Sequence, residues 1–337
     1  MSVRDLIIVG AGPSGLSAAI AATRLGIDYH LLDRGVLVNA IFNFPPQMVF
    51  FTTPELLEIG GVPFVTPYDK PTRHEALRYY RRVVETFDLR MSLGETVVAI
   101  QPDLDRSQGH GGASTFTLET TSVSGTRRTR RARFVVLATG YYDHPNRLGV
   151  PGEGLPHVRH YYSEPHPYFR RRVVIVGGGN SAAEAALEML RAGASVTIVH
   201  RHEELKSTIK YWVRPDIENR IREGSIAAHF NTRVTEIRPT TVVAEGPQGL
   251  VELPADAVFL LVGYHPDWDL MAAAGVQLTA RQAPVYDPAT FETNVPGLFV
   301  AGGALAGMDT GTIFIENGRF HGEAIVRAVA GRLAEGS

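Results

Sequence analysis

The chain contains no cysteine among its 337 residues. Without a thiol it can form no disulfide, no thiolate metal site and no iron–sulfur cluster. A redox-active Cys-x-x-Cys pair is excluded for the same reason. The 12 histidines show no spacing typical of metal ligands, and we expect no bound metal.

Long apolar runs and a large net charge are also missing. No stretch approaches the ~20 apolar residues that a membrane-spanning helix needs, and the first strand begins too early to leave room for a signal peptide. The formal net charge of −2 gives no general attraction to nucleic acid or to an anionic membrane. We therefore expect a cytoplasmic protein that binds neither. The arginine-rich run at 127–133 is the exception, and we interpret it as a solvated strand edge or turn rather than a binding patch.

A glycine motif near the N-terminus carries the first positive signal. Residues 6–9 are all apolar and predict a buried parallel strand, which runs into Gly10-x-Gly12-x-x-Gly15 and an alanine-rich helix. Gly10 permits a tight turn, Gly12 lets the backbone approach a pyrophosphate, and Gly15 lets helix and strand pack closely. The helix N-terminus offers N–H groups to phosphates. Asp33 ends a second strand 23 residues after Gly10 and can accept hydrogen bonds from a ribose. Together these features predict a dinucleotide cradle.

The next hundred residues predict an insertion in this domain. Segment 35–68 is rich in aromatics, proline and glycine, and it either fills the core or walls a flavin ring. The pattern at 73–87 predicts an amphipathic helix. Antiparallel strands are predicted at 97–100, 116–120 and 134–138, with a hairpin tip near 108–114. The last of these strands runs into Ala138-Thr139-Gly140, which we expect beside the cofactor.

The opening motif recurs 167 residues later, after a breaker-rich linker at 145–156. Residues 173–176 predict a strand, followed by a G-x-G-x-x-A turn from Gly177 and a helix over 182–192. His200 stands 23 residues after Gly177, at the position that Asp33 holds after Gly10. Two such cradles in one chain are far more specific than one.

The second cradle differs from the first in charge. Its acid position holds His200, followed by Arg201, His202 and Lys206. Cations at this place suit a 2′-phosphate, so we predict a preference for NADPH over NADH. A solvated basic turn is the alternative interpretation.

The C-terminal part predicts a return to the first domain. Strands near 233–237 and 257–261 close the second domain, and the turn with Gly263 is expected near the nicotinamide dinucleotide. A tail strand then ends in Gly302-Gly303. A helix is expected to start near 311–313 and to run past His321, with its N-terminus toward the flavin. We predict an α/β fold of two Rossmann-like domains, an FAD-binding domain at 1–155 and 280–337 and an NADPH-binding domain at 156–279.

These features resemble the flavoproteins with two dinucleotide-binding domains, in particular the small thioredoxin reductases. Within that group, three stretches are similar to the YpdA-type bacillithiol disulfide reductases, at 50–61, 138–143 and 313–322. The resemblance spans the whole chain and implies FAD in the first cradle, NADPH in the second, and a homodimer.

The motifs and the resemblance together assign residues to each cofactor. Those expected at FAD are Gly10, Gly12, Pro13, Ser14, Gly15, Asp33, Arg34, Val97, Ala138, Thr139, Gly140, Gly302, Gly303, Thr312 and Ile313. Those expected at NADPH are Gly177, Gly179, Asn180, Ser181, His200, Arg201, His202, Lys206 and Gly263.

The chain departs from the family at three points. Thioredoxin reductases carry a Cys-x-x-Cys in the second domain, and YpdA-type proteins often have cysteine where Ser14 stands. Many relatives also hold the ribityl chain with an aspartate at the place of Gly303, for which Asp309 is a candidate substitute. Without a protein thiol, reduced flavin has to pass electrons directly to the acceptor.

We therefore expect an NADPH-dependent flavoprotein oxidoreductase whose acceptor is a small-molecule disulfide, such as bacillithiol disulfide by resemblance, or a redox protein. His321, His144 and Tyr142 are candidate acid–base residues, although residues of these types more often have a structural role. The alternatives are a ferredoxin or flavodoxin–NADP reductase, a flavin monooxygenase, and a redox sensor without enzymatic activity.

Overall fold

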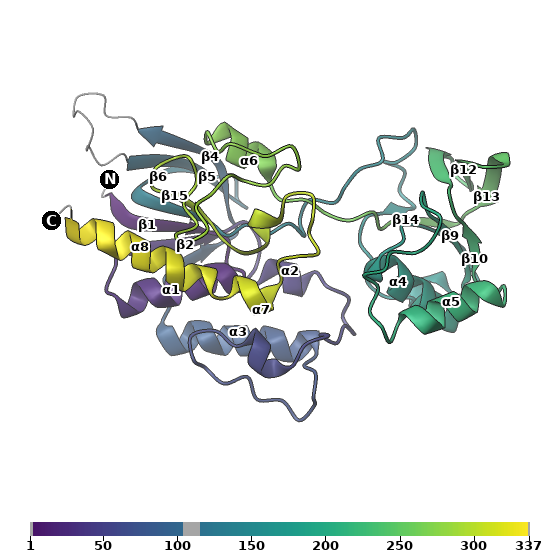
Figure 1. The fold of residues 1–337 in the computed structure, drawn as a ribbon, viewed down its shortest axis with the longest axis horizontal. Coiled ribbons are helices and arrows are strands. Elements are labelled where there is room, and N and C mark those ends of the chain that lie inside the picture. The colour runs from purple at the N-terminus through teal and green to yellow at the C-terminus, as the bar shows by residue number, and fades with distance from the viewer. Residues whose placement is uncertain (1–2, 104–114, 336–337) are drawn as a thin grey trace. The chain divides into compact units, whose positions relative to one another are not determined.

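The chain divides into two compact units in the computed structural model, which describes residues 3–103 and 115–335. One unit comprises Met1–His144 and Tyr264–Ser337, and the other comprises Pro145–Gly263 (Figure 1). The predicted hairpin tip at 108–114 lies outside the described residues. The predicted fold class is confirmed, because both units are α/β domains and the first is discontinuous.

The first unit is built on a seven-stranded sheet of order β3-β2-β1-β6-β5-β4, with β15 paired to β6. The N-terminal half of β6 pairs antiparallel with β5 and its last residues pair parallel with β15, so the predicted antiparallel insertion continues the parallel sheet. The strands are β1 (Arg4–Val9), β2 (Tyr29–Asp33), β3 (Met91–Leu93), β4 (Glu95–Asp103), β5 (Thr115–Ser122), β6 (Arg127–Leu137) and β15 (Leu298–Val300).

Alternation along β1 sends side chains to both faces of this sheet. Leu6 and Ile8 pack under α1, α3 and α8, whereas Ile7 and Val9 face a core formed with β4, β5 and α6. Figure 1 shows α8 running beside α1. The helices are α1 (Pro13–Arg24), α2 (Asn39–Phe42), α3 (Arg73–Phe87), α6 (Trp268–Ala273), α7 (Ile315–Gly318) and α8 (His321–Glu335), with 3₁₀ turns η1 (Pro54–Leu57) and η3 (Gly302–Ala306).

Segment 35–68 fills part of this core. Phe50 and Phe64 are buried, and Phe64 stacks on Tyr79 of α3 with ring centroids 4.4 Å apart. Phe42 and Phe51 are exposed instead. Core filling therefore explains the first pair of aromatic side chains but not the second.

The second unit repeats the parallel arrangement on a smaller sheet of order β10-β9-β8-β14-β7, accompanied by a three-stranded sheet β11-β12-β13. Helices α4 and α5 pack on one face of the larger sheet, and the three-stranded sheet contributes to the core on the other. The elements are β7 (Val158–Arg159), η2 (His166–Tyr168), β8 (Arg172–Val176), α4 (Asn180–Arg191), β9 (Ser195–Val199), α5 (Arg214–Arg222), β10 (Ala227–His229), β11 (Arg233–Ile237), β12 (Thr241–Gly246), β13 (Gly249–Pro254) and β14 (Ala257–Leu260).

The second unit begins and ends earlier than the predicted bounds of 156–279. Pro151 accepts a hydrogen bond from the N–H of Ile237 over 2.9 Å, which ties the linker to β11. At the other end, Met271 and Val276 lie in the core beside Ile7 and Val9 of β1. Packing therefore assigns residues 145–155 to the second unit and 264–279 to the first.

The predicted C-terminal helix is also corrected. Residues 311–314 are not helical, α7 begins at Ile315, and a break at Arg319 and Phe320 separates it from α8. The Arg319 guanidinium donates to the carbonyl oxygens of Glu55 and Glu58, at 2.6 and 2.7 Å. These tertiary contacts hold the chain at the break.

Candidate functional site

Three glycines shape the first cradle, and they have different neighbours. At Gly10, with φ +111°, a Cβ would lie 2.3 Å from the carbonyl oxygen of Ala138, and at Gly15 it would lie 1.9 Å from that of Gly10. A Cβ at Gly12 would meet no atom within 4 Å. The protein's own packing therefore requires glycine at the first and third positions. The second glycine faces open space, which fits a site where a ligand approaches the backbone.

Asp33 closes the cradle at the end of β2. Its Oδ2 accepts a hydrogen bond from the N–H of Ala11 and its Oδ1 from that of Gly35, both at 2.7 Å. Burial raises the pKa of Asp33, and the two N–H groups oppose this rise. Each carboxylate oxygen retains acceptor capacity. The side chain is thus held rigidly and can still accept from ribose hydroxyls.

Five predicted FAD residues meet in one pocket: Gly10, Asp33, Arg34, Val97 and Thr139. They come from the carboxyl ends of β1, β2 and β6 and from the first residues of β4. His144, which was predicted as a candidate acid–base residue, also lines this pocket. The sequence did not indicate the other lining residues, which are Val9, Leu32, Glu95, Thr96, Asp143, Asp267 and Leu270.

Arg34 lies at this pocket with an acidic partner. Its Nη2 is 3.0 Å from Asp143 Oδ2, and Asn39 Nδ2 donates to the other carboxylate oxygen over 3.2 Å. Asp143 therefore fixes the guanidinium at the pocket.

The tail of the chain returns to the first cradle. Ser14 Oγ donates to the carbonyl oxygen of Gly318 over 3.0 Å, and a Cβ on Gly302 would lie 2.3 Å from the same Oγ. At Gly303 a Cβ would lie 2.7 Å from the ring of Tyr141. The space that an acidic side chain at position 303 would need is therefore taken by Tyr141.

The remaining predicted FAD residues lie at the start of α1, directly after β6 and before α7. Pro13 is the first residue of α1, Ala138 donates its N–H to the last carbonyl of β1 over 2.8 Å, and Gly140 has φ +66°. Thr312 and Ile313 lie in the loop before α7, where Thr312 Oγ1 donates over 3.1 Å to a backbone carbonyl three residues earlier.

His321 has a defined structural contact. Its Nδ1 accepts the N–H of Gly302 over 3.1 Å, and its ring stacks on Phe291 with centroids 4.3 Å apart. Burial lowers the pKa of His321. Because Nδ1 is already an acceptor, only Nε2 remains for acid–base work.

His144 and Tyr142 lie close together in the sequence but have different surroundings. His144 lines the pocket, with its Nε2 3.6 Å from Asp267 Oδ2, and burial lowers its pKa while Asp267 raises it. Tyr142 packs between the rings of Phe44 and Tyr264, at centroid distances of 4.9 and 4.6 Å.

The second cradle repeats the geometry of the first. At Gly177 a Cβ would lie 2.3 Å from the carbonyl oxygen of Leu261. Gly179 is the N-cap of α4, and a Cβ there would approach only the Cδ of Lys206, at 3.7 Å. The backbone N–H of Lys206 donates to Gly178 over 2.8 Å. The lysine side chain therefore lies beside the turn that would take a pyrophosphate.

His200 differs from the expected cation. Its residue is 5% exposed, and a Cβ on Gly178 would lie 2.4 Å from its ring. Burial lowers the pKa of His200 to about 4, helped by the charges of its neighbours, so the ring is neutral near pH 7. Arg201 and Lys206 are exposed and supply the positive charge at this turn, and Arg201 Nε contacts His202 Nε2 at 3.1 Å.

Asn180, Ser181 and Gly263 complete the predicted NADPH set. Asn180 accepts from the N–H of Lys210 and donates to the carbonyl of Thr208, at 2.9 and 3.1 Å, which ties the basic loop to the start of α4. Ser181 is exposed in the first turn of that helix. Gly263 has φ +97°, in the turn that follows β14.

Residues 3–103 and 115–335 contain no group of three or more histidine and acidic side chains arranged to hold a metal ion. None of the helices described is long and apolar enough to cross a membrane.

Comparison with known proteins decides the family. Residues 7–302 match the family model described as pyridine nucleotide-disulphide oxidoreductase. The chain belongs to this family. As a pyridine nucleotide-disulphide oxidoreductase it is an enzyme, and its family implies a flavin and a pyridine nucleotide as cofactors.

Individual relatives of this oxidoreductase cover almost its full length. It is 42% identical to the bacilliredoxin reductase Bdr of Bacillus subtilis over 97% of each chain. It is similar to the solved bacillithiol disulfide reductase Bdr (YpdA) of Bacillus cereus, with 42% identity, a TM-score of 0.93, and coverage of 98% of this chain and 100% of the other. It is also 25% identical to a ferredoxin–NADP reductase of Ignicoccus hospitalis, over 89% of this chain and 90% of the relative. The predicted resemblance to YpdA-type reductases is confirmed.

Proposed function

We propose that this oxidoreductase uses FAD and NADPH to reduce a disulfide substrate such as bacillithiol disulfide, without a thiol of its own. One observation carries the proposal. A chain without any cysteine keeps both glycine cradles and is 42% identical over nearly its whole length to a relative named as a bacilliredoxin reductase.

The first cradle supports FAD as the flavin. Gly12 leaves room for a pyrophosphate, Asp33 is fixed to accept from a ribose, and Val97 lines the same pocket as Asp33. A mononucleotide flavin has no adenosine ribose for Asp33 to bind and would leave this part of the cradle unused. When bound, FAD supplies the chemistry that takes a hydride from NADPH and delivers electrons to a disulfide.

The second cradle supports NADPH as the reductant. The residue at its acid position is neutral, so no carboxylate there repels a 2′-phosphate. The exposed side chains of Arg201 and Lys206 provide cations at the same turn. Charge-assisted contacts to a phosphate are stronger than neutral ones, which favours NADPH over NADH.

The acceptor is proposed from the names of the relatives. One is called a bacilliredoxin reductase, and the other a bacillithiol disulfide reductase. Both names describe reduction of a disulfide, carried either by a small redox protein or by a small molecule. Because this chain has no cysteine, we infer that electrons reach that disulfide directly from the flavin.

A ferredoxin–NADP reductase is the second candidate. The observation that favours it is the 25% identity to the Ignicoccus hospitalis enzyme over most of both chains. Such an activity also needs no protein thiol. The lower identity places it behind the disulfide reductase.

Anaerobic stopped-flow spectroscopy tests the proposal. The flavin is first reduced with NADPH and then mixed with bacillithiol disulfide, an oxidised bacilliredoxin, a ferredoxin or oxygen in separate experiments. We expect rapid reoxidation by one of the two disulfides. Fastest reoxidation by ferredoxin would favour the second candidate, and a stable oxygen adduct of the flavin would favour a monooxygenase. No acceptor faster than oxygen would contradict a reductase function.

We also propose that the enzyme is a cytoplasmic homodimer, as the family resemblance implies. NADPH and a low-molecular-weight disulfide are substrates compatible with that location. Sedimentation equilibrium at several concentrations distinguishes a dimer from a monomer of 36.7 kDa.

A further inference from the structure

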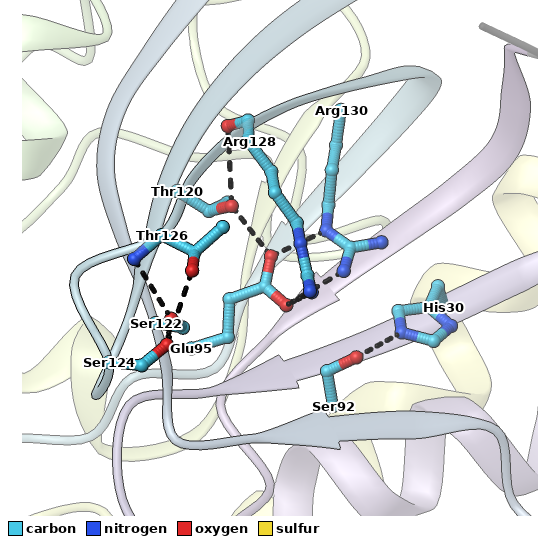
Figure 2. Close-up of polar contacts among 9 residues, drawn as sticks. All are labelled: His30, Ser92, Glu95, Thr120, Ser122, Ser124, Thr126, Arg128 and Arg130. Atoms are coloured by element: carbon cyan, nitrogen blue, oxygen red, sulfur yellow. Dashed lines mark hydrogen bonds and ion pairs between the residues drawn. The ribbon is translucent and has the colours of Figure 1, made fainter.

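An ion pair between β4 and β6 lies at the wall of the pocket that Asp33 and Val97 line. Glu95, the first residue of β4, accepts from Arg130 of β6 through two parallel hydrogen bonds of 2.7 Å each. Thr120 Oγ1 of β5 donates to Glu95 Oε1 over 2.6 Å. Figure 2 shows the carboxylate enclosed by these partners. The Glu95 side chain is 3% exposed and that of Arg130 is 20% exposed, so the pair is largely removed from water.

This pair is connected to the pocket through the backbone of β4. Glu95, Thr96 and Val97 are consecutive, and all three line the pocket together with Asp33. The pairing of β4 with β5 shifts register immediately after Val97. The three residues therefore form a short stretch paired with β5. The ion pair with Arg130 fixes its first residue, Glu95, and the register shift follows its last residue, Val97.

Glu95 itself is not available as a ligand for the cofactor. Arg130 and Thr120 donate hydrogen bonds to its carboxylate oxygens. Arg128 is a third partner, with its Nη1 3.5 Å from Oε2. These partners hold the pKa of Glu95 down at about 2, so the carboxylate stays charged. A group that lines a pocket but has both oxygens bound to the protein acts on the shape of that pocket.

A neighbouring histidine does not compete for this carboxylate. His30 of β2 shares a 2.8 Å hydrogen bond with Ser92 of β3, and Figure 2 shows the two beside the pair. Burial and the charge of Arg130 lower the pKa of His30 to about 4. Of the groups drawn around Glu95, Arg128 and Arg130 are therefore the charged partners at neutral pH.

Resting on the proposed use of FAD, we propose that Arg130 is a positioning residue for the adenosine half of that cofactor. Its paired hydrogen bonds to Glu95 hold Thr96 and Val97 in the pocket that they line with Asp33, where the adenosine diphosphate moiety would bind. Removing the guanidinium would leave a buried carboxylate without its main partner, and the start of β4 would move to hydrate it. Arg130 acts through Glu95 and touches neither flavin nor substrate.

The test compares Arg130→Met with Arg131→Met in the full-length protein. Arg131 is the next residue of β6 and pairs with Asp103 at 3.1 Å, but neither residue lines the pocket, so this variant loses an ion pair of the same strand. After flavin removal, FAD affinity is measured by quenching of flavin fluorescence, and ADP affinity by competition with FAD. We expect Arg130→Met to weaken both by the same factor, about tenfold or more. Arg131→Met should change neither by more than about twofold.

Three further readouts separate positioning from general loss of structure. The visible spectrum of flavin bound to Arg130→Met should match the wild type, NADPH affinity should be unchanged, and Arg130→Lys should restore part of the FAD affinity. Thr120→Val removes the hydrogen bond of Thr120 to Glu95, together with its 3.3 Å contact to the Arg128 carbonyl oxygen, and leaves both bonds from Arg130 in place. It should show a smaller loss in the same direction. Unchanged FAD affinity in Arg130→Met, or an equal loss in Arg131→Met, would overturn the proposal. Failure of the wild-type protein to bind FAD would instead contradict the proposed function.

Discussion

A buried, neutral histidine at position 200 leaves the second cradle without a negative charge where a 2′-phosphate would lie. The ring packs against Gly178, and burial is the main reason that its pKa falls to about 4. In the proposed NADPH site, we infer that His200 adds no repulsive charge and that the exposed side chains of Arg201 and Lys206 provide the attraction.

This burial has a consequence for the pH dependence of stability. In the unfolded chain His200 is protonated below its ordinary pKa of about 6.5. In the folded protein its pKa is about 4, so the ring stays neutral until the pH falls that far. The unfolded state binds more protons in this range, so the contribution of His200 lowers stability as the pH falls from about 6.5 to about 4. In His200→Asn the slope of unfolding free energy against pH should fall by up to ~1.4 kcal/mol per pH unit. Urea unfolding across this range measures the slope, and an unchanged slope would show that the ring is protonated in the fold.

The charge at Arg201 predicts cofactor preference. Arg201→Ala should raise the KM for NADPH about tenfold or more while leaving the KM for NADH nearly unchanged, because only NADPH carries the 2′-phosphate. Arg191→Ala is a matched control, since Arg191 lies at the far end of α4 and pairs with Asp216. Equal effects of Arg201→Ala on both cofactors would remove the assignment of Arg201 to the phosphate.

In the turn between β1 and α1, the fold requires one glycine, and another leaves space where a ligand would bind. Gly12 has φ −78° and ψ 177°, a conformation open to any residue, and a Cβ there meets no protein atom. Gly10 has φ +111° and no space for a side chain. One glycine serves the fold and the other leaves room for a ligand.

Gly12→Val should therefore purify without flavin and still fold. Its apoprotein should melt at nearly the temperature of wild-type apoprotein, because the added side chain enters space reserved for the pyrophosphate. Gly10→Val provides the contrast and should fail to fold, since its side chain would meet the Ala138 carbonyl. Full flavin content in purified Gly12→Val would contradict the cradle.

Elements with local signals were predicted well, and those defined by distant contacts were not. Helix α3 begins where predicted because Thr72 and Glu75 form a reciprocal capping box, which the local sequence specifies. The hairpin β12–β13 was missed, and the C-terminal helix was drawn as continuous although it breaks at Arg319. That break depends on carbonyl oxygens about 260 residues away in the chain, which no local pattern records.

At the scale of the whole molecule, contacts between residues distant in sequence also limit what can be predicted of the candidate site. Gly10, Asp33 and Thr139 could be singled out because each belongs to a local motif, and the fold brings these predicted site residues into one pocket. Glu95 and Asp143 were not, because their roles come from partners 35 and 109 positions distant in sequence. The second unit ends before the predicted residue 279 because α6 packs into the core of the first unit. That tertiary contact is not visible in the composition of the sequence.

At the scale of the whole molecule, electrons have no protein thiol to pass through between flavin and acceptor, because the chain contains no cysteine. An anaerobic titration of the purified flavoprotein with NADPH, followed by its absorbance, tests this most directly. We predict complete flavin reduction by about one equivalent of NADPH per flavin, with no further electrons taken up, and rapid recovery of oxidised flavin on adding bacillithiol disulfide or oxidised bacilliredoxin. A flavin that NADPH does not reduce, or a reduced flavin that neither disulfide reoxidises faster than oxygen does, would contradict the account.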